Sequence, residues 1–318
     1  MALLSIIVPC YNEEATVETF YAHTSAVCAQ LDGVEVEYLF VDDGSSDGTL
    51  ERLRALGERE RRARWLSLSR NFGKEAAMYA GLEHARGDYV AVMDADLQDP
   101  PELLPQLLKA VESGGYDCAA VRRVDRRGEP PIRSWFARQF YKLINKMSRT
   151  EIVDGARDFR LMRRQMVDAV LRLGEYNRFS KGIFSWVGFR TKWVETENLQ
   201  RCAGESKWSF FKLLVYALDG IIAFSTAPLA IASVLGLALC AVSFFAILFV
   251  IVRQLLWGGS AFGWPSLVCI ILFLAGVQLF CVGILGQYLA KTYLEVKKRP
   301  IYILREEGGR DGEEKEMG

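Results

Sequence analysis

The chain has 318 residues, of which 39 are basic and 39 are acidic, so its formal net charge is zero. This balance does not favour nucleic acid as a partner, because nucleic-acid-binding proteins concentrate positive charge. Hydrophobic residues make up 51% of the chain, and they are gathered in short runs in the first part and in two long runs near the end.

Four short apolar runs have the length and composition of strands buried on both faces. They are residues 3–9, 36–41, 64–69 and 89–93. Helices are expected between and after them, including residues 74–85 and 101–113. Fully apolar strands that alternate with helices predict an α/β, Rossmann-like domain with a mostly parallel sheet covered on both faces.

Polar side chains follow these strands at the point where each strand ends. In open sheets of this kind, ligands bind beyond the carboxyl ends of the strands. The residues expected at this rim are Tyr11, Asn12, Glu14, Asp42, Asp43, Asp94 and Asp96.

Asp94 and Asp96 are the most informative pair among these rim residues. Residues i and i+2 of an extended segment share a face, so both carboxylates can bind one divalent cation that keeps open positions for phosphate oxygens. The pair indicates a metal and diphosphate site. Two solvated aspartates in a loop are the alternative.

Two long runs, residues 229–252 and 266–290, contain no charged residue. As helices they would be about 36 Å long, against a hydrocarbon core of about 30 Å. They are predicted to form a two-helix transmembrane hairpin. A hairpin buried in a protein core is the alternative.

Flanking charge predicts the orientation of this hairpin. The connection at residues 253–265 has one basic residue, whereas lysines and arginines precede the first run and follow the second. Positive charge concentrates on the cytoplasmic side. We therefore expect a multi-pass protein of the cytoplasmic (inner) membrane, with both ends and the α/β domain facing the cytosol.

Three further segments have distinctive compositions. Residues 133–149 interleave apolar side chains with Arg and Lys, which is typical of a basic helix in the membrane interface, although the apolar residues would also suit packing on the sheet. Arg122 begins a basic stretch that is expected to be mobile. The tail after Pro300 is polar and is predicted to be disordered.

Six motifs occur in order along the chain: residues 5–14 (SIIVPCYNEE), 41–47 (VDDGSSD), 68–75 (LSRNFGKE), 94–100 (DADLQDP), 158–162 (DFRLM) and 181–182 (KG). With these motifs the chain resembles glycosyltransferase family 2, from about residue 4 to about residue 290. Within this family the chain is similar to the polyprenyl-phosphate glycosyltransferases, which include bactoprenol glucosyltransferases and dolichol-phosphate mannose synthase. The resemblance implies a GT-A-type fold, a nucleotide-sugar donor, Mg²⁺ or Mn²⁺ as cofactor, and inverting transfer to a lipid phosphate.

The resemblance also implies roles for individual residues. Asp158 would be catalytic, and Asp94, Asp96 and Gln98 would serve the metal and the diphosphate. The nucleotide-sugar pocket would be formed by Pro9, Tyr11, Asn12, Glu14, Asp42, Asp43, Lys74 and Asp94. A charge at a helix N-terminus is the alternative for Glu14, and a solvated residue in a first helical turn is the alternative for Lys74.

The acceptor phosphate needs cations, because it must be held beside an anionic donor. Residues 201–208 (RCAGESKW) stand where the family has Arg-x-x-Gly-x-Ser-Lys and an aromatic residue. The residues expected to bind the acceptor phosphate are Arg122, Arg201, Ser206 and Lys207. Ordinary flanking charge is the alternative for Lys207. Arg157 replaces the small residue usual before Asp158, and it is expected to contact a differently shaped acceptor or to point to solvent.

These expectations divide the chain into four parts: a catalytic domain (1–200), a juxtamembrane segment (201–228), two transmembrane helices (229–290) and a cytosolic tail (291–318). The predicted reaction moves one hexose, glucose from UDP-glucose, to undecaprenyl phosphate. The alternatives are mannose transfer from GDP-mannose to dolichol or another polyprenyl phosphate, and a non-catalytic membrane subunit with the same fold. The expected partners are a nucleotide-diphosphate sugar, a polyprenyl phosphate lipid and the membrane; a homo-oligomer is left open.

Overall fold

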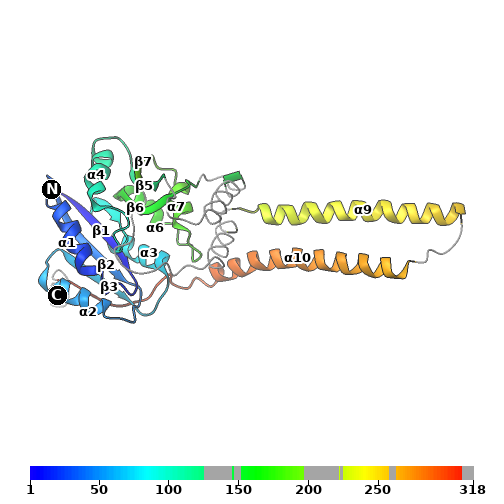
Figure 1. Ribbon diagram of the computed structural model, residues 1–318, viewed down its shortest axis with the longest axis horizontal. Helices are drawn as coiled ribbons and strands as arrows, with labels where there is room; N and C mark the ends of the chain where they lie inside the picture. Colours follow the sequence, from blue (N-terminus) through cyan, green and yellow to red (C-terminus); the bar gives the residue numbers. More distant parts are fainter. Residues whose placement is uncertain (125–144, 147–151, 197–221, 223–224, 258–262, 310–318) are drawn as a thin grey trace.

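The structure is a computed structural model that describes residues 1–124, 145–146, 152–196, 222, 225–257 and 263–309 (Figure 1). Within these residues, an α/β domain holds an eight-stranded sheet in the order β7-β5-β6-β4-β1-β2-β3-β8. Two long helices, α9 and α10, project from one side of this domain (Figure 1).

The four predicted strands are all present at the centre of the sheet. They are β1 (Ala2–Cys10), β2 (Val34–Asp42), β3 (Ala63–Leu68) and β4 (Tyr89–Val92). Strand β1 pairs in parallel with β2 and β4, and β2 pairs in parallel with β3. The connecting helices are α1 (Val17–Cys28), α2 (Thr49–Arg59), α3 (Lys74–His84) and, after the short 3₁₀ helix η1 (Pro101–Leu103), α4 (Leu104–Glu112).

The other half of the sheet is mixed, and the sequence did not predict its strands. It contains β5 (Cys118–Arg123), β6 (Ala156–Arg163) and β7 (Thr191–Thr196), with helices α6 (Arg164–Leu171) and α7 (Ser180–Trp186). Strand β6 runs antiparallel to both β4 and β5, and β5 is parallel to β7. The amino end of β6 therefore lies beside the carboxyl end of β4.

Side chains of β1 alternate between the two faces of the sheet, as the pleat requires. Ile6 packs in one buried cluster with Phe20 of α1, and Ile7 packs in the other with Met78 of α3. A Cβ atom on Gly81 of α3 would lie only 2.2 Å from Cγ2 of Ile7. Helix α3 thus lies very close to β1, and this contact fixes its first residue at the rim of the sheet.

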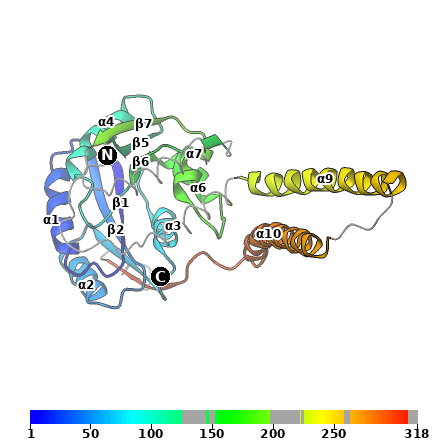
Figure 2. The same cartoon turned by 45° about the vertical axis from the view of Figure 1, so that its right-hand side comes forward.

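Helices α9 (Ala227–Trp257) and α10 (Trp264–Val296) lie side by side away from the α/β domain (Figures 1 and 2). They contain the candidate membrane spans Ala227–Arg253 and Ile270–Val296, with mean hydropathies of 2.9 and 2.2, and neither is buried in the protein. The alternative of a hairpin in a protein core is therefore wrong.

The chain returns to the α/β domain after α10 and adds strand β8 (Leu304–Gly308) antiparallel to β3 (Figure 2). The prediction of disorder after Pro300 is wrong for this segment. The predicted catalytic domain, residues 1–200, therefore leaves out one strand of its own sheet. The composition of this segment did not predict a strand, because an edge strand is stabilised largely by backbone hydrogen bonds. One such bond next to β8 is donated by Ser69 N–H to the Ile303 carbonyl at 2.9 Å.

Two predicted elements fall outside the described residues. The expected interfacial helix at 133–149 is described only at residues 145–146, which are helical. Most of the juxtamembrane segment 201–228 is also outside, including Arg201, Ser206 and Lys207.

Candidate active site

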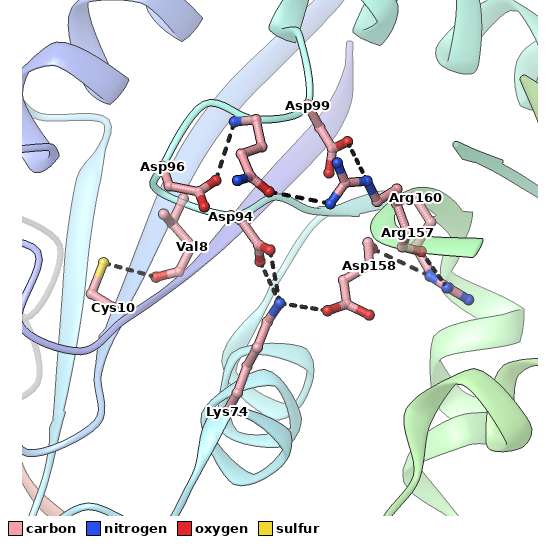
Figure 3. Close-up of polar contacts among 10 residues, drawn as sticks. Val8, Cys10, Lys74, Asp94, Asp96, Asp99, Arg157, Asp158 and Arg160 are labelled. Carbon is pink, nitrogen blue, oxygen red and sulfur yellow. Dashed lines mark hydrogen bonds and ion pairs between the residues drawn. The ribbon is translucent and has the colours of Figure 1, made fainter. Parts of the chain in front are cut away.

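The carboxyl ends of β1, β2 and β4 and the amino end of β6 meet at one rim of the sheet (Figure 3). Cys10 at the end of β1 is paired with Asp42 at the end of β2. Val92, the last residue of β4, is paired with Arg160 of β6. Asp158, two residues earlier in β6, therefore lies beyond the end of β4, close to Asp94.

Lys74, the first residue of α3, joins the two carboxylates at this rim (Figure 3). Its Nζ atom lies 2.7 Å from Oδ1 and 2.8 Å from Oδ2 of Asp94, and it also contacts Oδ2 of Asp158. The Asp158 side chain is 18% exposed and the Lys74 side chain is 43% exposed. The alternative of a merely solvated Lys74 is wrong, since its ammonium group bridges two acidic residues.

Charge pairing at the rim outweighs desolvation. Burial alone would raise the pKa of Asp158, but Lys74, Lys181 and Arg160 hold that pKa well below its usual range. Desolvation alone would lower the pKa of Lys74, but Asp158 and Asp94 raise it well above its ordinary value. Asp158 is thus a carboxylate, and Lys74 an ammonium ion, at neutral pH.

The loop after β4 carries Asp96 and Gln98, and its conformation is held by local hydrogen bonds. Oδ1 of Asp96 accepts a hydrogen bond from the Gln98 backbone N–H at 3.1 Å. Leu97 between them has a φ of 54°, which is uncommon for a residue other than glycine. The loop therefore depends on contacts with the rest of the site.

Arg157 supplies such a contact from β6 (Figure 3). Its Nη1 donates to Oε1 of Gln98 at 3.3 Å, and its Nε lies 3.3 Å from Oδ1 of Asp99. The Asp99 side chain is 4% exposed. Burial raises the pKa of Asp99 to about 6, although Arg157 lowers it. The expectation that Arg157 points to solvent is wrong, because its guanidinium group ties the loop to β6.

The rim offers carboxylate oxygens that could bind a metal ion. No group of three His, Cys, Asp or Glu side chains able to hold a metal occurs in the described part of the chain. Mg²⁺, however, is usually held by one or two carboxylates together with substrate phosphates and water. Asp94 and Asp96 provide two such carboxylates at a strand end, so the rim fits a metal that is bound together with a diphosphate. The assignment of Gln98 as a ligand stays a prediction.

Asp42 and Asp43 shape the loops that surround the rim. Asp42 accepts hydrogen bonds from Ser45 N–H and from the Ser67 hydroxyl, both at 3.0 Å. Asp43 accepts from the backbone N–H groups of residues 72 and 73 at 2.7 and 2.9 Å. Burial raises the pKa of Asp43. Both carboxylates are engaged within the protein, and their contact with a nucleotide stays a prediction.

The loop after β1 is built in the same way. Oδ1 of Asn12 accepts from Ser46 N–H at 2.9 Å, and Oε2 of Glu14 accepts from Gly48 N–H at 3.1 Å, next to the start of α2. Glu14 therefore makes the contact with a helix N-terminus that was the alternative to nucleotide binding in the sequence analysis. Pro9 lies within β1, and Tyr11 is 41% exposed at the rim. The nucleotide roles of these four residues stay predictions.

Arg122 belongs to β5 and forms an ion pair with Glu195 of β7. It is therefore part of the sheet, and the expectation that it lies in a mobile stretch is wrong. Its role toward an acceptor phosphate is untested.

Sequence reasoning missed two contacts that support the rim. Oε2 of Glu75 accepts hydrogen bonds from both the backbone N–H (3.0 Å) and the hydroxyl of Ser180. The Arg160 guanidinium lies 3.8 Å from the centre of the Phe184 ring. The four residues lie in or near the motifs listed above. Their contacts could not be predicted, because no local sequence pattern indicates that residues so far apart in the chain meet.

Sequence comparison identifies the family of this chain. The model of a family described as Glycosyl transferase family 2 matches residues 5–171. The chain is 43% identical to the bactoprenol glucosyl transferase of Shigella phage SfII over 302 residues, which are 95% of this chain and 97% of that protein. It is 41% identical to the prophage bactoprenol glucosyl transferase homolog of Escherichia coli (strain K12), over 95% of this chain and 98% of that protein. The chain belongs to glycosyl transferase family 2.

The predicted GT-A-type fold class and the glycosyltransferase assignment are thereby confirmed. Solved structures are similar at lower identity. Mannosyl-3-phosphoglycerate synthase from Rubrobacter xylanophilus has a TM-score of 0.48 at 20% identity, over 70% of this chain and 73% of that one. Glucosyl-3-phosphoglycerate synthase from Mycobacterium tuberculosis, in complex with Mn²⁺ and UDP-glucose, has a TM-score of 0.47 at 20% identity, over 70% and 77%. Family membership rests on the sequence matches.

Proposed function

We propose that this protein transfers one glucose from UDP-glucose to undecaprenyl phosphate, with inversion at the anomeric carbon, on the cytoplasmic face of the inner membrane. The observation that carries the proposal is the position of Asp94 and Asp158 around the Lys74 ammonium at the carboxyl rim of the sheet, with Asp96 in the loop that follows β4. The names of the two bactoprenol glucosyl transferases support the sugar and the lipid.

The reaction forms one bond and breaks one. An oxygen of the lipid phosphate attacks the anomeric carbon, and the bond from this carbon to the diphosphate breaks, so that its electron pair leaves with UDP. A phosphate monoester has a second pKa of about 6 and is largely dianionic at neutral pH. The nucleophile therefore needs little deprotonation.

Asp158 and Lys74 then have distinct tasks. Because its pKa is low, Asp158 is a weak base; it chiefly positions the acceptor and takes a proton only from the monoanion. Lys74, held by Asp94 and Asp158, supplies a positive charge at the place where the diphosphate leaves.

Asp94 and Asp96, with Gln98 beside them, would hold Mg²⁺ or Mn²⁺, which when bound neutralises charge on the leaving diphosphate. Contacts to the nucleoside are assigned to Pro9, Tyr11, Asn12, Glu14, Asp42 and Asp43. Contacts to the acceptor phosphate are assigned to Arg122, Arg201, Ser206 and Lys207.

The test is to incubate the purified full-length protein with undecaprenyl phosphate and labelled UDP-glucose, UDP-galactose or GDP-mannose. We expect lipid-linked sugar from UDP-glucose only. Chelation of divalent cations should abolish turnover, and so should Asp96→Asn, whereas the control Asp32→Asn at an exposed site should not. Turnover of GDP-mannose instead would favour the mannose synthase, and a folded protein inactive with every sugar would favour the non-catalytic subunit.

A further inference from the structure

A cavity of about 530 Å³ lies where α10 returns to the α/β domain. Its wall includes Tyr79 and Glu83 of α3, Glu295 of α10, and Lys298, Arg299 and Tyr302 of the segment that leads to β8. This volume lies within the range of about 300–1,000 Å³ that is typical of small-molecule sites.

The cavity is separate from the active site. Helix α3 begins at Lys74, which contacts Asp94 and Asp158, whereas Glu83 stands at the other end of the helix. At 1.5 Å per residue, the two positions are about 13 Å apart along the helix axis. A ligand in the cavity would therefore not be a reactant.

The position of the cavity relates it to the membrane. The uncharged part of α10 ends at Ala290, and Lys291 is its first charged residue. Leu294, less than one turn later, lines the cavity. If α10 spans the bilayer, the cavity lies at the level of the lipid headgroups, on the side of the α/β domain.

The acidic side chains in the wall are engaged within the protein. Oε2 of Glu83 accepts a hydrogen bond from the Tyr302 hydroxyl at 2.6 Å. Oε1 of Glu295 accepts hydrogen bonds from the backbone N–H groups of Tyr176 and Asn177, at 3.0 and 3.1 Å. Each of these two carboxylates therefore already accepts at least one hydrogen bond from the protein.

The basic side chains in the wall are not engaged in this way. Lys298 and Arg299 are both exposed, and neither side chain has a hydrogen bond or ion pair with any residue that the structure describes. Among the described residues, neither of these two positive charges in the wall is paired with a carboxylate. A basic pocket beside a membrane helix on the cytoplasmic side suits an anionic lipid headgroup.

The backbone of Lys298 gives a second, independent observation. Its φ is +47°, a conformation that costs free energy in a residue other than glycine or asparagine. A glycine here would form the same turn with less strain. The lysine instead brings an ammonium group to the cavity wall.

We propose that this cavity binds the headgroup of an anionic phospholipid, whose phosphate contacts Lys298 and Arg299 while the glycerol end lies against Leu294. Free phosphate shares the chemistry of this headgroup, but only a lipid also gains from the position of the cavity at the end of α10. The proposal is independent of the sugar that the enzyme transfers.

The test measures binding of phosphatidylglycerol to the full-length protein in detergent by native mass spectrometry. Lys298→Gln and Arg299→Gln should each weaken binding roughly fivefold, the usual contribution of one basic residue near an anionic surface. The matched control is Lys297→Gln, because Lys297 is outside the cavity wall and its ammonium lies 4.2 Å from the centre of the Tyr293 ring. It should change binding less than twofold.

Two results would overturn the proposal. An equal loss in all three variants would mean a diffuse attraction between the lipid and surface charge. Displacement of phosphatidylglycerol by inorganic phosphate at equal concentration would mean a phosphate site without lipid specificity.

A further variant separates binding from folding. Lys298→Gly relieves the positive φ, so its melting temperature should be equal to or above that of the wild type, while its affinity for phosphatidylglycerol falls as in Lys298→Gln. Wild-type affinity in Lys298→Gly would contradict the proposal.

Discussion

Arg54 and Glu306 form an ion pair although 252 residues separate them in the chain. One guanidinium nitrogen, Nη2 of Arg54, lies 2.6 Å from Oε1 and 2.7 Å from Oε2 of Glu306. The pair joins α2 to β8, and therefore joins the segments before and after the two long helices.

We expect charge reversal at this pair to loosen β8. Arg54→Glu places two carboxylates together, and backbone amides of β8 should exchange with deuterium roughly fivefold faster, since a partly exposed pair is worth at most about 1 kcal/mol. Arg54→Glu combined with Glu306→Arg should restore the wild-type rate. A rate as fast in the double variant as in the single one would show that the pair does not hold β8.

Asp158→Asn tests whether this carboxylate moves a proton. Because the acceptor is mostly dianionic above its second pKa of about 6, the variant should lose much more of its kcat at pH 6 than at pH 8. Measurement of kcat with undecaprenyl phosphate at both pH values would show this. Equal losses at both would leave Asp158 with positioning alone.

Arg157→Ala should loosen the loop that carries Asp96 and Gln98. It leaves the Asp99 carboxylate buried without its cation, so the free energy of unfolding should fall by about 2 kcal/mol, less than for a fully buried pair because Arg157 is 21% exposed. The KM for the nucleotide sugar should rise.

The control for this prediction is Arg61→Ala, at an exposed position away from the rim. The combination of Arg157→Ala with Asp99→Asn should recover much of the lost stability. If the costs of the two substitutions simply add, the ion pair is not the cause.

Glu75→Gln should make the stability of the protein less dependent on pH. Burial raises the pKa of Glu75 above its ordinary 4.5, although Ser180 lowers it. Because its pKa is raised in the folded state, protonated Glu75 stabilises the fold. This contribution to the free energy of unfolding is fully present below the unfolded-state pKa and is lost as the pH rises through the folded-state pKa. Gln keeps an oxygen that can accept from Ser180.

The measurement is the free energy of unfolding of both proteins from pH 4 to pH 8. Above pH 4.5, the wild type should lose stability relative to Glu75→Gln. The exposed control Glu35→Gln should follow the wild type. A difference between wild type and Glu75→Gln that does not change with pH would refute the prediction.

The proposed cytosolic orientation of the α/β domain predicts a labelling pattern. A cysteine at Gly263, before α10, should react with an impermeant maleimide added to intact cells, whereas a cysteine at Glu35 should react only after lysis. The wild type, with its own cysteines, gives the background. The opposite pattern would reverse the proposed topology.

The central sheet and the rim were predictable because each depends on local sequence. An apolar run followed by Asp42 or Asp94 reports both a buried strand and the side chain at its end. The bridge from Lys74 to Asp158 was not predictable in this way, because it joins residues 84 positions apart and depends on how β6 pairs with β4.

The mixed half of the sheet was harder to predict for a physical reason. Strands β5, β6 and β7 include charged residues, among them Asp158 and Arg160 at the rim, so they do not read as apolar runs. Their pairing order also differs from their order in the chain. Strand β8 is more polar still. Its place is decided by the path of the chain after α10 and by the free edge of β3.

The position of β8 in the chain also orders the biosynthesis of the protein. The edge of β3 is covered by residues that are translated only after both long helices. Until then, β3 exposes unpaired backbone groups, which are a site for aggregation in other proteins. The sheet of the α/β domain can therefore be completed only after the two long helices have been synthesised. In a nascent chain arrested before Leu304, this sheet lacks its last strand.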